Sequence, residues 1–133
     1  VRMAERGERR DPFKLDVQYD EMIEWLTQRK EQLEQLELRT PDAETVIDEL
    51  ANTIRLIEHA AALYRYIYRI NLAGAEEELV WLEVLHSQLE TTVAEFNRLW
   101  LLRNRPGGLA RSNAAFHKLL DRYEERILEL RHR

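Results

Sequence analysis

Apolar residues recur at alternating steps of three and four residues along most of this chain, from about residue 16 to residue 131. This spacing places them on one side of an α-helix, which completes a turn every 3.6 residues. Only 4 glycines and 3 prolines interrupt the 133 residues, so the apolar stripes are long. The pattern predicts a few long amphipathic helices that bury their stripes against one another.

Capping residues and turns divide the pattern into four helices. Asp16 is the predicted N-cap of a first, shorter helix over about residues 16–38. Residues 40–42 (Thr-Pro-Asp) begin a second helix, because Thr caps a helix and Pro is tolerated at its first position. We expect this helix to run to about Leu72.

A third helix is expected from about Ala75 to residues 103–105, because Pro106 disfavours helix at the residue before it and two glycines follow. The fourth helix covers about residues 109–131. The stripes of the four helices, in order, are Tyr19, Met22, Ile23, Leu26, Leu33 and Leu36; Ala43, Ile47, Leu50, Ile54, Ile57, Ala61, Tyr64 and Tyr68; Leu79, Leu82, His86, Leu89, Val93, Phe96 and Trp100; and Leu109, Asn113, Phe116, Leu120, Tyr123, Ile127 and Leu130.

The connections between these helices are short, which favours antiparallel neighbours. The sequence therefore predicts an all-α fold, an antiparallel up-down bundle of three long helices plus one shorter helix. Because Arg29 interrupts the stripe of the first helix, a second arrangement stays open. In it the first helix lies on one side of a core made by the three long helices. Residues 1–14 are charged and carry no stripe, so we expect a linker or tail there, anchored by Phe13, and a single domain over residues 15–133. A start at Val1 leads us to expect a piece of a longer chain.

Charge and composition exclude several functional classes. The formal net charge is −5, from 25 acidic and 20 basic residues, which argues against a nucleic-acid partner. The chain has no Cys, so thiolate chemistry and zinc–thiolate sites are excluded. No apolar run approaches the roughly 18 residues of a membrane span, so we expect no membrane partner.

Two Glu-x-x-His motifs have the spacing that four-helix bundles use to bind two metal ions. They are Glu83 with His86 and Glu129 with His132. The other helices offer no inward Glu at a matching level, and His132 is the penultimate residue. Adjacent acids such as those at 20–21 and 48–49 point about 100° apart on a helix and do not converge. We therefore predict no catalytic residue, no metal ligand and no cofactor.

The passage around the third turn is the most unusual part of the sequence, because a large aromatic residue, two guanidinium groups and an amide lie close together there. One interpretation is a corner in which Arg103 or Asn104 satisfies the free carbonyl groups of the helix end. The other is a docking surface, since Trp and Arg frequently anchor interfaces. The candidate interface residues are Trp100, Arg103, Asn104 and Arg105.

The run Leu99–Leu109, with Ser112 three residues further on, resembles the C-terminal helical region of bacterial family 20 glycoside hydrolases, which are β-N-acetylhexosaminidase-like proteins. Asp48-Glu49-Leu50 and His59-Ala60 on the preceding helix agree with the resemblance, which extends over roughly residues 40–125. In that family an Asp-Glu pair on a β/α barrel performs the chemistry. Nothing here matches that motif, so no catalytic residue is carried over.

The resemblance implies a non-catalytic accessory domain of a larger hydrolase, which would pack on the catalytic barrel of the same parent chain or on a second copy of the domain. The alternative is a stand-alone helical protein-interaction module, which should have an exposed apolar groove between two helices.

Overall fold

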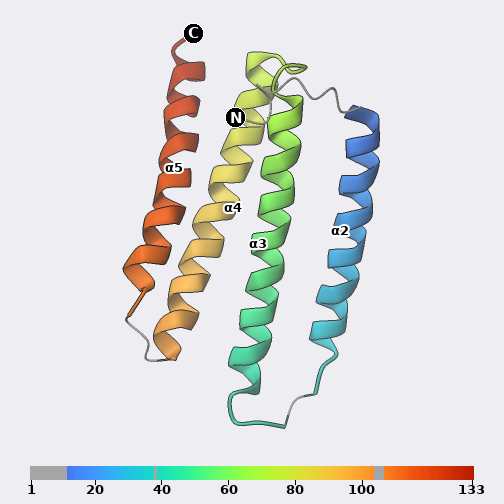
Figure 1. The fold of residues 1–133 in the computed structure, drawn as a ribbon, viewed down its shortest axis with the longest axis vertical. Coiled ribbons are helices and arrows are strands. Elements are labelled where there is room, and N and C mark those ends of the chain that lie inside the picture. The colour runs from blue at the N-terminus through green and yellow to red at the C-terminus, as the bar shows by residue number, and fades with distance from the viewer. Residues whose placement is uncertain (1–11, 38, 104–106) are drawn as a thin grey trace.

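The computed structural model describes residues 12–37, 39–103 and 107–133, with side chains from Asp16 onward (Figure 1). Within those residues there are four helices and no strand, so the predicted all-α bundle is confirmed. Successive helices run in opposite directions (Figure 1). They are α2 (Pro12–Glu34), α3 (Ala43–Arg69), α4 (Ala75–Leu102) and α5 (Leu109–Arg131).

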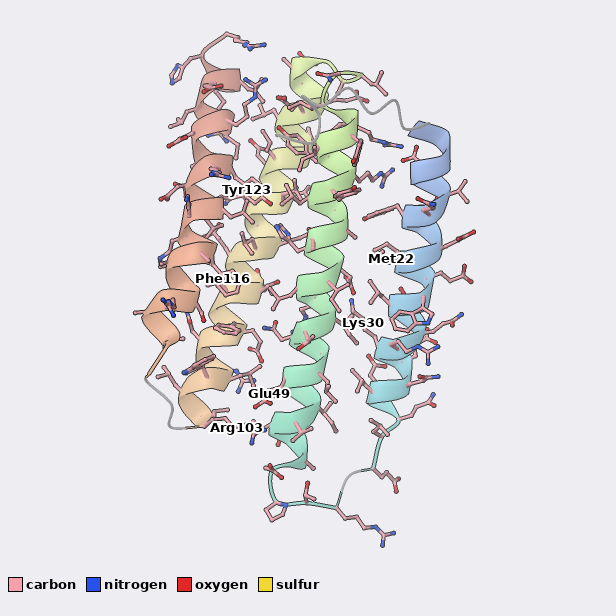
Figure 2. The ribbon with its side chains drawn as sticks, in the orientation of Figure 1. Met22, Lys30, Glu49, Arg103, Phe116 and Tyr123 are labelled. Carbon is pink, nitrogen blue, oxygen red and sulfur yellow. The ribbon has the colours of Figure 1, made fainter. Side chains whose placement is uncertain are left out.

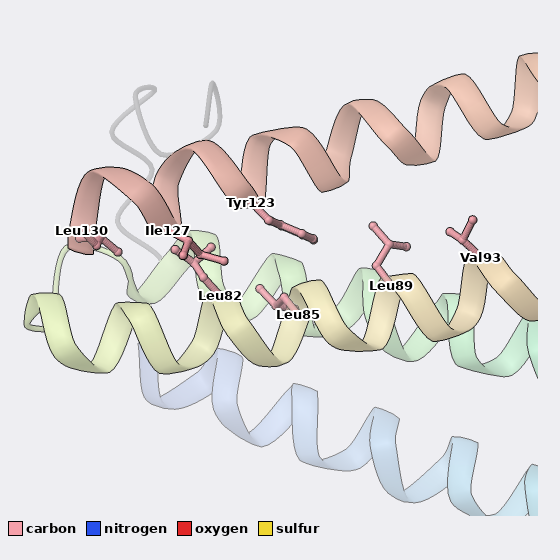
Figure 3. Packing of buried hydrophobic residues seen from close by; sticks show 7 residues of the cluster. All are labelled: Leu82, Leu85, Leu89, Val93, Tyr123, Ile127 and Leu130. Atoms are coloured by element: carbon pink, nitrogen blue, oxygen red, sulfur yellow. The ribbon is translucent and has the colours of Figure 1, made fainter. Parts of the chain in front are cut away.

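Each helix packs mainly on its neighbour in sequence, α2 on α3, α3 on α4 and α4 on α5. The two views in Figures 1 and 3 both place α2 and α5 on opposite sides of the α3–α4 pair. The architecture is therefore a core of α3, α4 and α5 with α2 against the outer side of α3, which is the alternative that the sequence left open. The expectation that the first helix is shorter than the other three was wrong, since α2 and α5 both have 23 residues.

Two helix starts differ from the predicted positions. Helix α2 begins at Pro12 rather than Asp16, because proline fits the first helical turn, where its missing N–H is not needed. Helix α3 begins only at Ala43, with Asp42 as N-cap. The Ala43 N–H donates to the Thr40 carbonyl over 3.1 Å, so Thr40, Pro41 and Asp42 form a β-turn before the helix rather than its first residues.

The main hydrophobic core joins α4 and α5 (Figure 3). Helix α3 adds partly buried residues to it. The stripes predicted for these two helices supply most of the core, so that part of the prediction is confirmed. The fully enclosed members are Leu82, Leu85, Leu89, Val93, Tyr123, Ile127 and Leu130.

The stripe predicted for α3 is not its most buried face. Ile54 of the predicted stripe is buried, but Leu50 and Ile57 remain 45% and 43% exposed, whereas Asn52 and His59, which lie outside the stripe, are buried. Both faces are apolar because α3 lies between α2 on one side and α4 and α5 on the other. Counting a single stripe assigns one buried side to a helix, and that assumption was wrong for α3.

Helix α2 is attached by a thin interface. Leu26 is the sole buried side chain among its described residues, although Tyr19, Ile23 and Leu33 are partly covered. None of the described helices has an apolar stretch of the length that a bilayer span needs.

We predict that Leu82→Ala, at a position only 1% exposed, lowers the free energy of unfolding by about 2–5 kcal/mol, because it opens a cavity in the α4–α5 core. Urea unfolding followed by circular dichroism measures the change. The matched control is Leu128→Ala on the outside of α5, which is 53% exposed and should shift stability by about 0.5 kcal/mol or less. Equal effects of the two variants would contradict this assignment of the core.

Candidate interaction surface

The predicted docking corner lies where α4 ends and α5 begins. Trp100 is partly buried, and its ring packs against Phe96 with the ring centroids 5.4 Å apart. Gly108 has a positive φ of 83°, and a Cβ there would meet the Trp100 ring at 3.7 Å. Trp100 therefore lies against Gly108, immediately before α5. Asn104 and Arg105 lie outside the described residues.

Arg103 binds across the corner to the start of α3. Its Nε donates to Glu49 Oε1 over 2.5 Å, and its Nη1 lies 3.6 Å from Asp42 Oδ2 (Figure 2). The side chain thus bridges the end of α4 and the beginning of α3, instead of capping helix-end carbonyl groups as one interpretation expected. Much of its charge is matched within the chain.

The Glu-x-x-His residues of α4 have separate partners. His86 lies between two carboxylates, with Nδ1 2.8 Å from Glu90 and Nε2 2.9 Å from Glu124. Glu83 instead accepts a hydrogen bond from Arg131 of α5. In the described part of the chain no three His, Asp or Glu residues gather as a metal ion would require.

The adjacent acids Asp48 and Glu49 also diverge. Asp48 binds Arg98 over 3.0 Å, whereas Glu49 binds Arg103. Each carboxylate therefore fixes α3 to a different turn of α4. The two groups do not converge on one point where a substrate bond could lie.

A buried ion pair that sequence reasoning missed connects α4 and α5. Glu78 has a side chain only 4% exposed, and both its oxygens accept hydrogen bonds from Arg126 at 3.0 and 3.1 Å. Burial beside Glu78 raises the pKa of Tyr66 to about 12. The sequence did carry a signal, since Glu78 lies four residues before Leu82 and so continues the α4 stripe.

A second polar contact connects α3 and α5. His59 Nε2 lies 2.8 Å from the Tyr123 hydroxyl, and the two rings meet edge to face. Burial lowers the pKa of His59 below its ordinary value of 6.5. On the same side of α3, Asn52 donates to the Thr92 carbonyl of α4 over 3.2 Å. These polar contacts fix how the three core helices are aligned.

Several exposed apolar side chains of the described residues lie on one face of α2 and α3, away from the α4–α5 core. We call this surface the outer face. Two stripes with steps of three and four run along it, so each lies on one side of its helix. The outer face comprises Met22, Trp25, Arg29 and Gln32 of α2, Leu36 just beyond the end of α2, and Val46, Leu50, Thr53, Ile57, Ala60 and Tyr64 of α3.

Large apolar side chains on this face remain exposed. Met22, Trp25 and Leu36 are 46%, 55% and 46% exposed. With Leu50 and Ile57 of α3, five large apolar side chains on this face are exposed, and apolar surface gathered on one face is typical of interaction sites.

A groove of about 400 Å³ lies between the two helices of the outer face, with Met22 on one wall and Ile57 on the other. Tyr64 and Tyr68 share a hydrogen bond of 2.9 Å along it. At the end where α2 begins and α3 ends, Asp16 pairs with Arg69 and lies 3.5 Å from Arg65. The groove is therefore apolar along its walls and charged at one end, where the charges are already paired.

Arg29 is the one charged side chain on the two stripes. Its guanidinium lies 4.8 Å from the centre of the Trp25 ring, and it donates a 2.8 Å hydrogen bond to Gln32. Lys30, the next residue along α2, is turned toward α3, where it pairs with Glu58 (Figure 2). The outer face is consequently almost free of unmatched charge.

Comparison of the chain with protein-family models, with curated proteins and with solved structures gives no match. The family 20 resemblance therefore stays a prediction from the run at residues 99–109.

We predict that the free energy of unfolding falls as pH drops below about 6.5, because the unfolded chain takes up a proton that buried His59 resists. Above that pH His59 is neutral in both states, so its contribution is fully present. His59→Gln should flatten the dependence between about pH 6.5 and pH 5, measured by urea unfolding at several pH values. The matched control, His117→Gln at an exposed site, should keep the slope of the unchanged chain.

We predict that Arg126→Leu destabilises the chain by about 2 kcal/mol, because it leaves the Glu78 carboxylate buried without a cation. The loss is smaller than for a fully enclosed pair, since the Arg126 side chain is itself 30% exposed. Adding Glu78→Leu to Arg126→Leu should restore most of the stability. A double-mutant cycle by urea unfolding measures this, and simple additivity of the two losses would contradict it.

Proposed function

We propose that this chain is a non-catalytic helical domain for protein–protein docking, and that the outer face of α2 and α3 is its docking surface. The observation that carries the proposal is the combination of two exposed apolar stripes with the groove between them. A stand-alone interaction module was expected to have such a groove between two helices.

The shape of this surface favours a protein partner over a small ligand. The stripes follow two long helices, and their spacing is the one with which helices pack against other helices. Exposed Trp25 and Met22 supply the kinds of side chain that contribute most at protein interfaces. A small molecule in the groove would leave most of the outer face uncovered.

The family 20 resemblance gives this proposal a narrower form, in which the partner is the catalytic barrel of a β-N-acetylhexosaminidase-like parent chain. The corner at Trp100 and Arg103 is then a second candidate contact, because it holds the run of residues that carries the resemblance. Its support is weaker than that of the outer face, since Arg103 already binds Glu49 and Trp100 already packs on Phe96.

The proposal is tested in the complete natural polypeptide that contains this chain, with glutamate placed on the outer face. We predict that Ile57→Glu weakens domain or subunit assembly at least tenfold, which corresponds to roughly 1.4 kcal/mol, because docking would bury a carboxylate. Assembly is measured as the mass in solution and as the concentration dependence of thermal unfolding.

The matched control is Val80→Glu on α4, which also introduces an acid at an exposed apolar position, 58% exposed, but away from the outer face. Assembly that responds equally to the two variants, or to neither, would refute the docking role. For the narrower form, a chromogenic N-acetylglucosaminide is incubated with the isolated chain. Hydrolysis at an enzymatic rate would exclude a non-catalytic accessory domain.

A further inference from the structure

We infer that the occupant of the outer face is a second copy of this chain, so that the α2–α3 layers of two copies close into a four-helix bundle. This inference rests on the proposed docking function and makes it more specific. It assigns the partner, the helices in contact and the symmetry of the contact.

The arrangement of the helices is the first argument. On its inner side α3 packs against α4 and α5, whereas on the outer face α2 and α3 form a layer of two antiparallel helices with nothing against it in the described structure. Both stripes alternate steps of three and four residues, as the seams of helical bundles do. A second α2–α3 layer has the same length and the same two seams, so it could fit this layer along its whole extent.

The area of the face is the second argument. From Val46 to Tyr64 the outer face covers 19 residues of α3, about 28 Å, and two helices side by side are about 20 Å wide. The face thus offers about 560 Å² per copy, and pairing two copies would bury about 1,100 Å². This area is above the roughly 1,000 Å² that a biological interface needs, so a second copy covers enough surface for a dimer at the small end of the size range.

Charge is the third argument. The chain carries a net charge of −5, which opposes close approach of two copies elsewhere on the surface. On the two stripes Arg29 is the single charged residue, and it already lies over Trp25. The contact of a two-fold dimer must be complementary to itself, which an almost uncharged apolar face satisfies and a face of one sign does not.

The experiment measures the mass of the purified chain in solution by sedimentation equilibrium, up to about 100 μM, above the micromolar dissociation constants that mark the weak end for interfaces of this size. The expected mass is twice the 16.0 kDa of one chain. Leu50→Glu should weaken the dimer at least about 100-fold, because each dimer would bury two carboxylates. The matched control, Leu128→Glu on α5, should dimerise as the unchanged chain does.

Circular dichroism verifies that each variant keeps its helices. If Leu50→Glu does not fold, Trp25→Ser replaces it, since Trp25 is 55% exposed and its removal opens no core cavity. Because the chain has no Cys, one introduced at Met22 carries a single nitroxide label. Dipolar coupling between labels in the dimer is expected at Met22→Cys and should be much weaker at Leu128→Cys.

A chain that stays monomeric throughout this concentration range would overturn the inference. So would a dimer that Leu128→Glu disrupts and Leu50→Glu leaves intact. These outcomes are distinguishable from failure of the docking role. If the chain is monomeric but Ile57→Glu still weakens assembly of the complete polypeptide, the docking surface stands. Its partner is then another protein surface and not a second copy. If Ile57→Glu leaves the assembly of the complete polypeptide unchanged, both the docking surface and the dimer are refuted.

Discussion

Helix α3 packs against α2 on one side and against the α4–α5 core on the other, so it needs two apolar faces. Its inner side packs His59, Ala62, Leu63 and Tyr66 toward α4 and α5, while its other side receives α2. Since α2 makes its contacts with α3, the order of the layers follows from this one helix. The outer face exists because α3 and α2 together leave apolar side chains uncovered on the side away from the core.

Buried polar contacts set the alignment of the three core helices. If only hydrophobic stripes held the helices, a helix could shift by one turn at a modest cost in free energy, because one apolar side chain would take the position of another. Displacing α5 by one turn would instead separate Arg126 from Glu78 and Tyr123 from His59, and each would leave a buried polar group without its partner. Such contacts add little net stability but can select one alignment among several, which is a role documented for polar residues in coiled coils.

Much of this fold was predictable from the sequence, because α4 and α5 each have a single apolar face and a glycine before them. The stripes of those helices and the bounds of α5 follow directly from spacing. The two faces of α3 were harder to predict, since a helix packed on both sides shows one strong stripe and one weak stripe that contains Asn52 and His59. The pairing of Glu78 with Arg126, 48 residues later, depends on three-dimensional packing, which residue spacing does not show. The docking corner drew attention because Trp100, Arg103 and two further polar residues follow one another closely in the sequence, whereas the residues of the outer face are spread over two helices and no spacing reveals their exposure.

The thin attachment of α2 has a consequence for how the molecule opens. With Leu26 as its sole buried side chain among the described residues, α2 can detach in a partial opening that leaves the cluster of α4 and α5 intact. Half of the outer face belongs to α2, so the surface would vanish in that opened state although most of the secondary structure persists. The free energy needed to lose the binding surface would then be smaller than the free energy needed to unfold the whole chain. Mild heat or dilute denaturant would abolish binding before it unfolds the core.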